Sequence, residues 1–298
     1  FVTHQTPFYG ESGGQVGDVG VARSASGAVV RVTDTQKPLD GLFVHFGKVE
    51  SGAIAVGDEL TLEVDHAART ATRRNHSATH ILHWALRKVL GEAATQKGSL
   101  VAPDRLRFDF SHPRPVTAEE LTAIEDLVNG KLLGDAPIVT EVLPIDEAKK
   151  RGAMAIFGDK YGATVRVLTM THDSVELCGG THARSLGEIG LFKIVSESGV
   201  AAGVRRIEGA TGLNALAYVR ELEGTLRAAG SLLKATPSDL ADKVEKVIAH
   251  GKQLEKDLEV AKRKLAMGGS GGGDGGGGGL DGMLARAREI PGGKALAV

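Results

Sequence analysis

The sequence predicts an α+β fold, made of a small β-barrel-like unit, a larger α+β domain and an antiparallel helical hairpin. Short apolar runs alternate with glycine-rich turns at the start, strand and helix patterns are then interleaved, and the last third is helical only. We therefore expect four parts: a β unit over 1–65, an α+β domain over 66–211, a helical arm over 212–266, and a tether with the start of a further domain over 267–298.

Composition and charge exclude several classes of protein. The chain has 298 residues, of which 42% are hydrophobic, and no apolar run approaches the roughly 18 residues of a membrane span. The formal charge is -1, so any nucleic acid must be met by a local basic patch. A single cysteine cannot form an internal disulfide and no signal sequence is recognised, so we expect a cytoplasmic protein without membrane contact. Because Phe1 replaces the usual Met, we expect a piece of a longer protein.

The first strands and the first long helix follow from hydrophobic spacing. Between His66 and about Leu90 apolar residues recur every three or four positions, and Gly91 follows as a stop, which predicts a half-buried helix. Strands are expected before it at Ala28–Val32, Leu42–Phe46 and Leu60–Val64.

The second half of the α+β domain continues the interleaved pattern. Leu106, Phe108 and Phe110 alternate with charged residues, which predicts a strand with one exposed face. Thr117 is the expected N-cap of the next helix, with Glu120 at the capping-box position. Further strands are expected at 164–170, 175–177, 190–196 and 204–208.

The last third of the chain predicts two helices. One ends at Gly230, and the next begins at Thr236-Pro237, an N-cap followed by proline at the first helical position. From Leu240 to Leu265 apolar residues alternate at spacings of four and three, which is a heptad seam. The helices can form a projecting or dimerising hairpin, or lie on their own domain; the sequence leaves this open. Residues 268–279 are almost all glycine and predict a flexible tether.

Two pairs of residues predict a metal site. His76 and His80 stand four apart on one face of the first helix, and Cys178 has His182 four positions later, with two glycines between them. By composition alone, both pairs together would occur in roughly 1% of such chains. A thiolate with three imidazoles is a usual Zn²⁺ shell, whereas Ser77 excludes the HExxH metalloproteases. Four protein ligands are typical of structural zinc, so a catalytic or a structural role stays open.

Two polar residues near this site are candidates for reading a substrate hydroxyl. Thr79 shares the metal face of the helix, and Gln96 follows the helix with a free amide. The alternatives are a threonine bonded to its own helix backbone and a solvated loop amide. His83, one turn further along, is expected at the surface and is not counted as a ligand.

Arginines cluster at two places, Arg73 with Arg74 and Arg205 with Arg206, and would suit the phosphate backbone of RNA. Solvated arginines are the commoner explanation of such clusters. The glycine-rich stretches lack the GK[ST] of a nucleotide-binding loop, so no nucleotide site is inferred.

Seven stretches resemble alanyl-tRNA synthetase, from its editing region into its C-terminal part. Their order and variety make the resemblance specific, and it extends over residues 1 to 266. Freestanding proteins that deacylate mischarged tRNA share the metal pattern and remain an alternative, although they usually carry Glu-Gly-Gly-Gly where this chain has Glu-Ser-Gly-Gly. The stretches are Thr6–Tyr9 with Glu11–Gln15, Asn75–His80, Gln96–Leu100, Arg107–Phe110, Ala153–Gly158, Glu176–His182 and Gly203–Glu208.

The resemblance implies an editing function. The four expected ligands would hold Zn²⁺, Thr79 and Gln96 would line the pocket, and the reaction would be hydrolysis of serine or glycine from mischarged tRNA(Ala). The full-length family ligates alanine to tRNA(Ala) with ATP, through a ligase domain that we expect outside this chain. A homodimer through the helical arm is a further expectation. Two other classes remain open: a tRNA-binding module with structural zinc, and an assembly fragment that dimerises through the seam.

Overall fold

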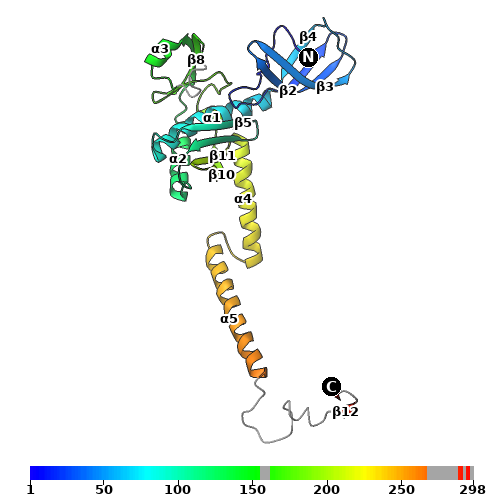
Figure 1. The fold of residues 1–298 in the computed structure, drawn as a ribbon, viewed down its shortest axis with the longest axis vertical. Helices are drawn as coiled ribbons and strands as arrows, with labels where there is room; N and C mark the ends of the chain where they lie inside the picture. Colours follow the sequence, from blue (N-terminus) through cyan, green and yellow to red (C-terminus); the bar gives the residue numbers. More distant parts are fainter. Residues whose placement is uncertain (155–161, 267–287, 291–292, 296–298) are drawn as a thin grey trace. The chain divides into compact units, whose positions relative to one another are not determined.

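The computed structural model describes residues 1–154, 162–266, 288–290 and 293–295, and confirms a mixed α+β protein (Figure 1). Contacts divide the chain into two units, Phe1–Glu221 and Leu222–Val298. The expected glycine tether and the end of the Ala153–Gly158 stretch lie outside the described residues. No helix among the described residues is long and apolar enough to cross a bilayer.

The first sheet is built from the N-terminal residues and is antiparallel throughout, in the order β3-β2-β1-β4. The three strands expected from the sequence are present, and one further strand, β1, joins them. β3 and β4 are its edge strands, so the structure does not confirm a closed barrel. The strands are β1 (Gly20–Ser24), β2 (Val29–Leu39), β3 (Leu42–Ser51) and β4 (Leu60–Val64).

The second sheet carries the main core on one face, in the order β10-β11-β6-β5. Helices α1 (His66–Leu90) and α2 (Ala118–Leu133) pack on it and on each other, and both were expected from the sequence. The capping box between Thr117 and Glu120 is confirmed in both directions. Strand β5 was not expected. The strands are β5 (Gln96–Val101), β6 (Leu106–Ser111), β10 (Phe192–Ala201) and β11 (Val204–Thr211).

The third sheet delivers the cysteine motif to helix α1. Its antiparallel order is β7-β8-β9, and β9 ends at Leu177, immediately before Cys178. β9 contacts α1, while the short helix α3 packs on β7 and β8. The elements are β7 (Val139–Pro144), α3 (Ile145–Lys150), β8 (Thr164–Thr171) and β9 (Ser174–Leu177), followed by the 3₁₀ turn η1 (Gly187–Ile189).

The helices of the last third differ at their ends from the sequence expectation. Helix α4 (Gly212–Leu233) runs through Gly230, so that predicted stop is wrong; the left-handed residue after the helix is Lys234, at φ 49°. Helix α5 (Leu240–Ala266) begins after Thr236-Pro237, because those residues form a turn in which the Asp239 N–H donates to Thr236 O. The predicted hairpin is not confirmed. β12 (Arg288–Ile290) pairs with β13 (Gly293–Ala295).

We predict that Phe108→Ala lowers the free energy of unfolding by about 3–5 kcal/mol, because it leaves a large cavity under helix α1. Phe108 is fully buried in the main core, whereas Phe46 on β3 is 51% exposed and serves as the matched control. Urea denaturation followed by circular dichroism measures both. Equal losses for Phe108→Ala and Phe46→Ala would contradict this placement of the core.

Candidate metal centre

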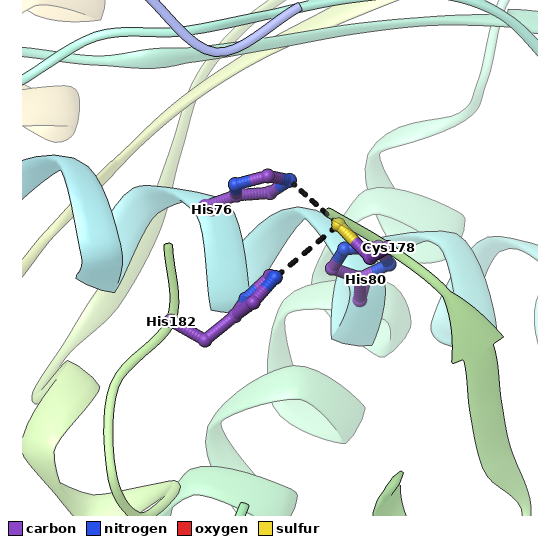
Figure 2. Close-up of side chains that lie close together, drawn as sticks. All are labelled: His76, His80, Cys178 and His182. Atoms are coloured by element: carbon purple, nitrogen blue, oxygen red, sulfur yellow. Dashed lines mark hydrogen bonds between the residues drawn. The ribbon is translucent and has the colours of Figure 1, made fainter. Parts of the chain in front are cut away.

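The structure brings the two predicted pairs together. His76 and His80 come from α1, and Cys178 and His182 from the loop after β9; their four ligand atoms lie within 4.8 Å of one another (Figure 2). It is the one such group of His, Cys, Asp or Glu side chains among the described residues. Such a cluster can hold a metal ion.

The donor atoms face one another at distances that a shared ion would bridge. Cys178 Sγ lies 3.5 Å from His76 Nε2 and 3.2 Å from His182 Nε2. His80 Nε2 is buried and has no hydrogen-bond partner in the described part of the chain. A buried polar nitrogen without a partner is costly in a folded protein, so a ligand at this point would relieve the cost.

Each imidazole also has an outer polar partner at Nδ1, which leaves Nε2 directed at the cluster. This arrangement is typical of metal-ligating histidines, because the bond at Nδ1 fixes the tautomer and the ring orientation. The donor set and its outer partners therefore both fit a metal ion. The pairs are His76 with Gln15 Oε1 at 2.7 Å, His80 with Glu176 Oε2 at 2.6 Å, and His182 with Ser77 Oγ at 3.2 Å.

The side-chain amide of Gln15 is held in one orientation by Thr181, a residue of the loop between Cys178 and His182. Its Oε1 accepts from the Thr181 backbone N–H at 2.8 Å, and its Nε2 donates to Thr181 Oγ1 at 2.9 Å. Oε1 is thereby fixed as an acceptor, so His76 Nδ1 must carry the proton and Nε2 is free for a metal. Sequence reasoning assigned Gln15 no role, because nothing local connects it to a histidine 61 positions later.

Glu176 is an outer partner that sequence reasoning missed, although its position in the sequence carries a signal. It stands two positions before Cys178, so alternation along an extended strand places both on one side. Its side chain is 3% exposed and lies within 4.0 Å of His83 Nδ1 as well as bonding to His80.

The electrostatics favour the protonation state that a metal ligand needs at Cys178 and His182, whereas His80 is held protonated and would lose a proton on binding a metal. Burial opposes ionisation of the Cys178 thiol, but His76 and His80 beside it hold its pKa well below the usual range. Burial, with His76 adding to it, lowers the pKa of His182 to about 3, so this imidazole is neutral. Burial also disfavours charged His80, yet Glu176 and Cys178 raise its pKa well above the usual value. A thiolate and a neutral imidazole are ready to bind a cation.

One of the two loop glycines is required by close packing. A Cβ at Gly180 would lie 2.0 Å from His76 Cε1 and 2.9 Å from Gln15 Oε1, whereas a Cβ at Gly179 would meet nothing within 4 Å. Arg166 on β8 holds the loop from the other side by donating to the Gly180 carbonyl. The absence of a side chain at Gly180 therefore lets the loop press against the helix.

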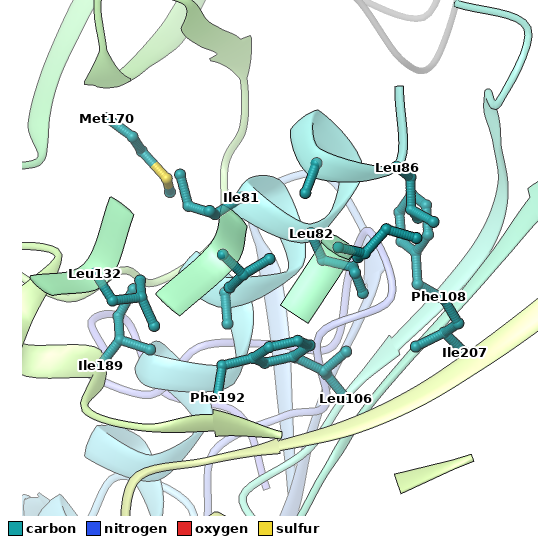
Figure 3. Close-up of a cluster of buried hydrophobic side chains, with 14 of the residues drawn as sticks. Ile81, Leu82, Leu86, Leu106, Phe108, Leu132, Met170, Ile189, Phe192 and Ile207 are labelled. Atoms are coloured by element: carbon teal, nitrogen blue, oxygen red, sulfur yellow. The ribbon is translucent and has the colours of Figure 1, made fainter. Parts of the chain in front are cut away.

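The rest of α1 is fixed by the main core, and this corrects the expected position of His83. Ile81 and Leu82 are fully buried among side chains of the second sheet and α2 (Figure 3). His83 is only 3% exposed and packs on Phe108, so its predicted surface position is wrong. Helix α1 is covered by α2, β9 and the second sheet, so it has less solvent-facing surface than one amphipathic stripe predicts.

A pocket of about 620 Å³ opens beside the cluster, and it includes both predicted hydroxyl readers. Thr79 and Gln96 line it together with His76, His80 and Cys178. The opposite wall comes from the N-terminal residues and the first sheet, which sequence reasoning did not connect with the site. These additional lining residues include Tyr9, Ser12, Lys37 and Phe43.

The two predicted readers differ in what they already bond. Thr79 Oγ1 donates to Asn75 O at 2.8 Å, so the backbone-bonded alternative is observed, while the oxygen lone pairs remain acceptors. Gln96 begins strand β5 rather than lying in a loop, and its Nε2 donates to Ser99 Oγ at 3.1 Å. Tyr9 keeps its proton, because burial raises the pKa of its phenol to about 12.

The four arginines singled out in the sequence have different surroundings. Arg205 bonds both oxygens of Glu197, and Arg206 bonds both oxygens of Asp109. Arg73 and Arg74 lie on α1 next to a separate pocket.

Comparison with known proteins places these features in a class. Residues 165–208 match the family described as threonyl and alanyl tRNA synthetase second additional domain, and residues 1–68 match tRNA synthetases class II (A). Cys178 and His182 fall within the first match, while His76 and His80 lie between the two. Over these two stretches the chain is similar to class II aminoacyl-tRNA synthetases.

The particular relatives are alanine–tRNA ligases. The chain is 62% identical over 296 residues to the enzyme of Sorangium cellulosum (strain So ce56). This alignment covers 99% of the chain and 32% of the relative. The chain is 52% identical over 278 residues to the enzyme of Chelativorans sp. (strain BNC1), covering 90% of this chain and 31% of the relative. The chain is therefore homologous to alanine–tRNA ligases, as its motifs predicted, and spans about a third of the length of these relatives.

We predict that Gly180→Ala weakens metal binding by about 10- to 100-fold, the range for disturbed outer partners, because the methyl group displaces His76 and Gln15. Gly179→Ala is the matched control and should retain binding, since its methyl group meets no atom. Competition with a chromogenic chelator measures the affinity of each variant. Equal affinities would show that the loop does not need this close approach.

Proposed function

We propose that this chain hydrolyses the ester bond between serine or glycine and tRNA(Ala), with Zn²⁺ held by His76, His80, Cys178 and His182. The observation that carries the proposal is the joint lining of one pocket by the cluster and by Thr79 and Gln96. Homology to alanine–tRNA ligases supports tRNA(Ala) as the partner.

The chemistry of the substrate explains why such a site is needed. Serine exceeds alanine by one hydroxyl and glycine is smaller, so a pocket that binds alanine cannot reject either strongly. A second, hydrolytic site can remove serine selectively, because it reads the hydroxyl that alanine lacks. Alanine in that site would leave a buried polar partner unpaired, which protects the correct product.

Two residues of the pocket divide the recognition. The proton of the Thr79 hydroxyl is committed to Asn75 O, so its oxygen accepts the hydrogen bond of a serine hydroxyl. The Gln96 amide has a second N–H besides the one bonded to Ser99, and it donates to the serine oxygen or the ester. Buried His76 and His80 line the same pocket, so the ester would lie next to the metal ligands.

A zinc ion bound by these four residues would act as a Lewis acid for the ester and the attacking water. The residues that surround it hold the ligands in place: Gln15 through His76, and Glu176 through His80. Loss of Gln15 or Glu176 would therefore act mainly on the orientation of the metal ligands and less on the shape of the pocket.

A second candidate function is a tRNA-binding module with structural zinc. It is favoured by the donor count, since four protein ligands complete a tetrahedral shell and leave no open position for substrate. It predicts binding of uncharged tRNA and no turnover, so the same assay separates the two functions.

The zinc-loaded chain is expected to release serine and glycine, but not alanine, from tRNA(Ala). His76→Ala should reduce hydrolysis to the uncatalysed rate and the zinc content below one per chain, whereas His66→Ala, an exposed histidine on the same helix, should retain both. The measurements are acid-precipitable radioactivity and metal analysis. Full hydrolysis by a zinc-free His76→Ala protein would overturn the role of the metal; absent turnover with bound zinc would favour the binding module.

Thr79→Val is expected to slow the release of serine about 10-fold, the value of one lost hydrogen bond, while release of glycine changes little because glycine has no hydroxyl. Thr72→Val is the matched control. Thr72 is buried on the same helix and donates to Ala68 O, but it does not line the pocket. Single-turnover rates on both charged tRNAs provide the readout. Equal slowing of serine and glycine would contradict a hydroxyl reader at Thr79.

A further inference from the structure

A second pocket lies directly beside the metal cluster on helix α1. It has a volume of about 270 Å³, and its walls join the helix just before His76 to the loop just after His182. None of the four candidate metal ligands lines it. Its lining residues are Thr70, Arg73, Arg74, Ala183, Arg184 and Glu188.

The charges around this pocket do not balance. Arg184 is paired with Glu188 at 2.6 Å, and Arg69, the next arginine along the helix, is paired with Asp18. These pairs leave Arg73 and Arg74 as two positive charges without a carboxylate partner among the described residues. The pocket therefore carries a net charge of about two positive units.

Arg73 is the residue that points to a ligand. Its Nε is buried and has no hydrogen-bond partner in the described part of the chain. Arg74 is held in place by donating Nε to the Glu188 carbonyl at 2.8 Å, which leaves its terminal nitrogens to bond elsewhere. Burial, and then Arg69, lower the pKa of Arg73, whereas the carboxylates of Asp18 and Glu188 act in the opposite direction.

The other two arginines that the sequence singled out provide the contrast. Arg205 and Arg206 lie in β11, and each forms a two-point ion pair with a carboxylate, at 2.5 and 2.7 Å to Glu197 and at 2.7 and 2.8 Å to Asp109. Their donors are already used within the fold, so they are poor binders of a phosphate. Of these four arginines, Arg73 and Arg74 are therefore the two whose charge is available to a nucleic acid.

We propose that Arg73 and Arg74 form a phosphate-binding pocket that takes one backbone phosphate of the RNA whose acylated end enters the neighbouring pocket. The proposal rests on the proposed function for the identity of the RNA. A guanidinium fork matches a phosphate oxyanion, and the phosphate satisfies the buried Arg73 Nε–H. Arg73 stands three positions before His76, so a phosphate here would fix the strand about one helical turn from the ester.

The test measures how an RNA hairpin that ends in CCA and carries no amino acid binds to the 298-residue chain. Binding is followed by fluorescence anisotropy over a series of salt concentrations. Arg73→Gln and Arg74→Gln should each weaken binding and reduce the slope of log K against log salt by about 0.7–0.9, the loss of one phosphate contact. Arg73→Lys should restore the slope, because it keeps the charge. Arg220→Gln, an exposed arginine on α4, should leave the slope unchanged.

A local readout accompanies the binding curves. Inorganic phosphate should shift the Arg73 Nε–H resonance of the wild-type chain and compete with the RNA. An unchanged salt slope in Arg73→Gln, with unchanged thermal unfolding, would overturn the proposal; so would a resonance that responds to phosphate but not to RNA, which would indicate a small-anion site. Because this RNA carries no amino acid, the binding result does not depend on hydrolysis. If the editing reaction failed, the phosphate-binding proposal would still be tested by these measurements.

Discussion

The close approach of the cysteine loop to helix α1 is the constraint on which the rest of the site depends. Three imidazoles and a thiolate meet within 4.8 Å, and each of the three histidines is less than a tenth exposed. Such a cluster is stable only if the polar nitrogens are bonded on both sides. Gly180 permits the approach by having no side chain, and Arg166 holds the loop from behind. The third sheet positions this loop, because β9 ends immediately before Cys178.

The outer partners distribute the site over the whole first unit. Gln15 comes from the N-terminal residues, Glu176 from the third sheet and Ser77 from the helix itself. A shift of the N-terminal residues would therefore change the orientation of the His76 ring, although these residues contribute no metal ligand. The same residues form one wall of the 620 Å³ pocket, so ligand orientation and pocket shape are set by the same packing.

Local patterns predicted the elements well wherever one mechanism dominated. The capping box at Thr117 and Glu120 and the long helix from His66 to Leu90 are as expected, because caps and apolar spacing act within a few residues. The predictions that failed did so for two reasons, one a tertiary contact and the other a local turn. His83 is buried because neighbouring elements cover the helix, and the turn at Thr236 shows that an N-cap pattern does not fix where a helix begins.

The four cluster residues and the resemblance to alanyl-tRNA synthetase could be identified from the sequence by itself. The reason is that the donor atoms of a side chain and a spacing of four residues are local properties, visible in the sequence. Only the tertiary structure decided which partners orient those donors and which arginines are free. Gln15 and His76 are 61 positions apart, and Asp109 and Arg206 are 97 apart. Such contacts depend on how sheets and helices pack, and no periodicity along the chain encodes which buried polar atom meets which.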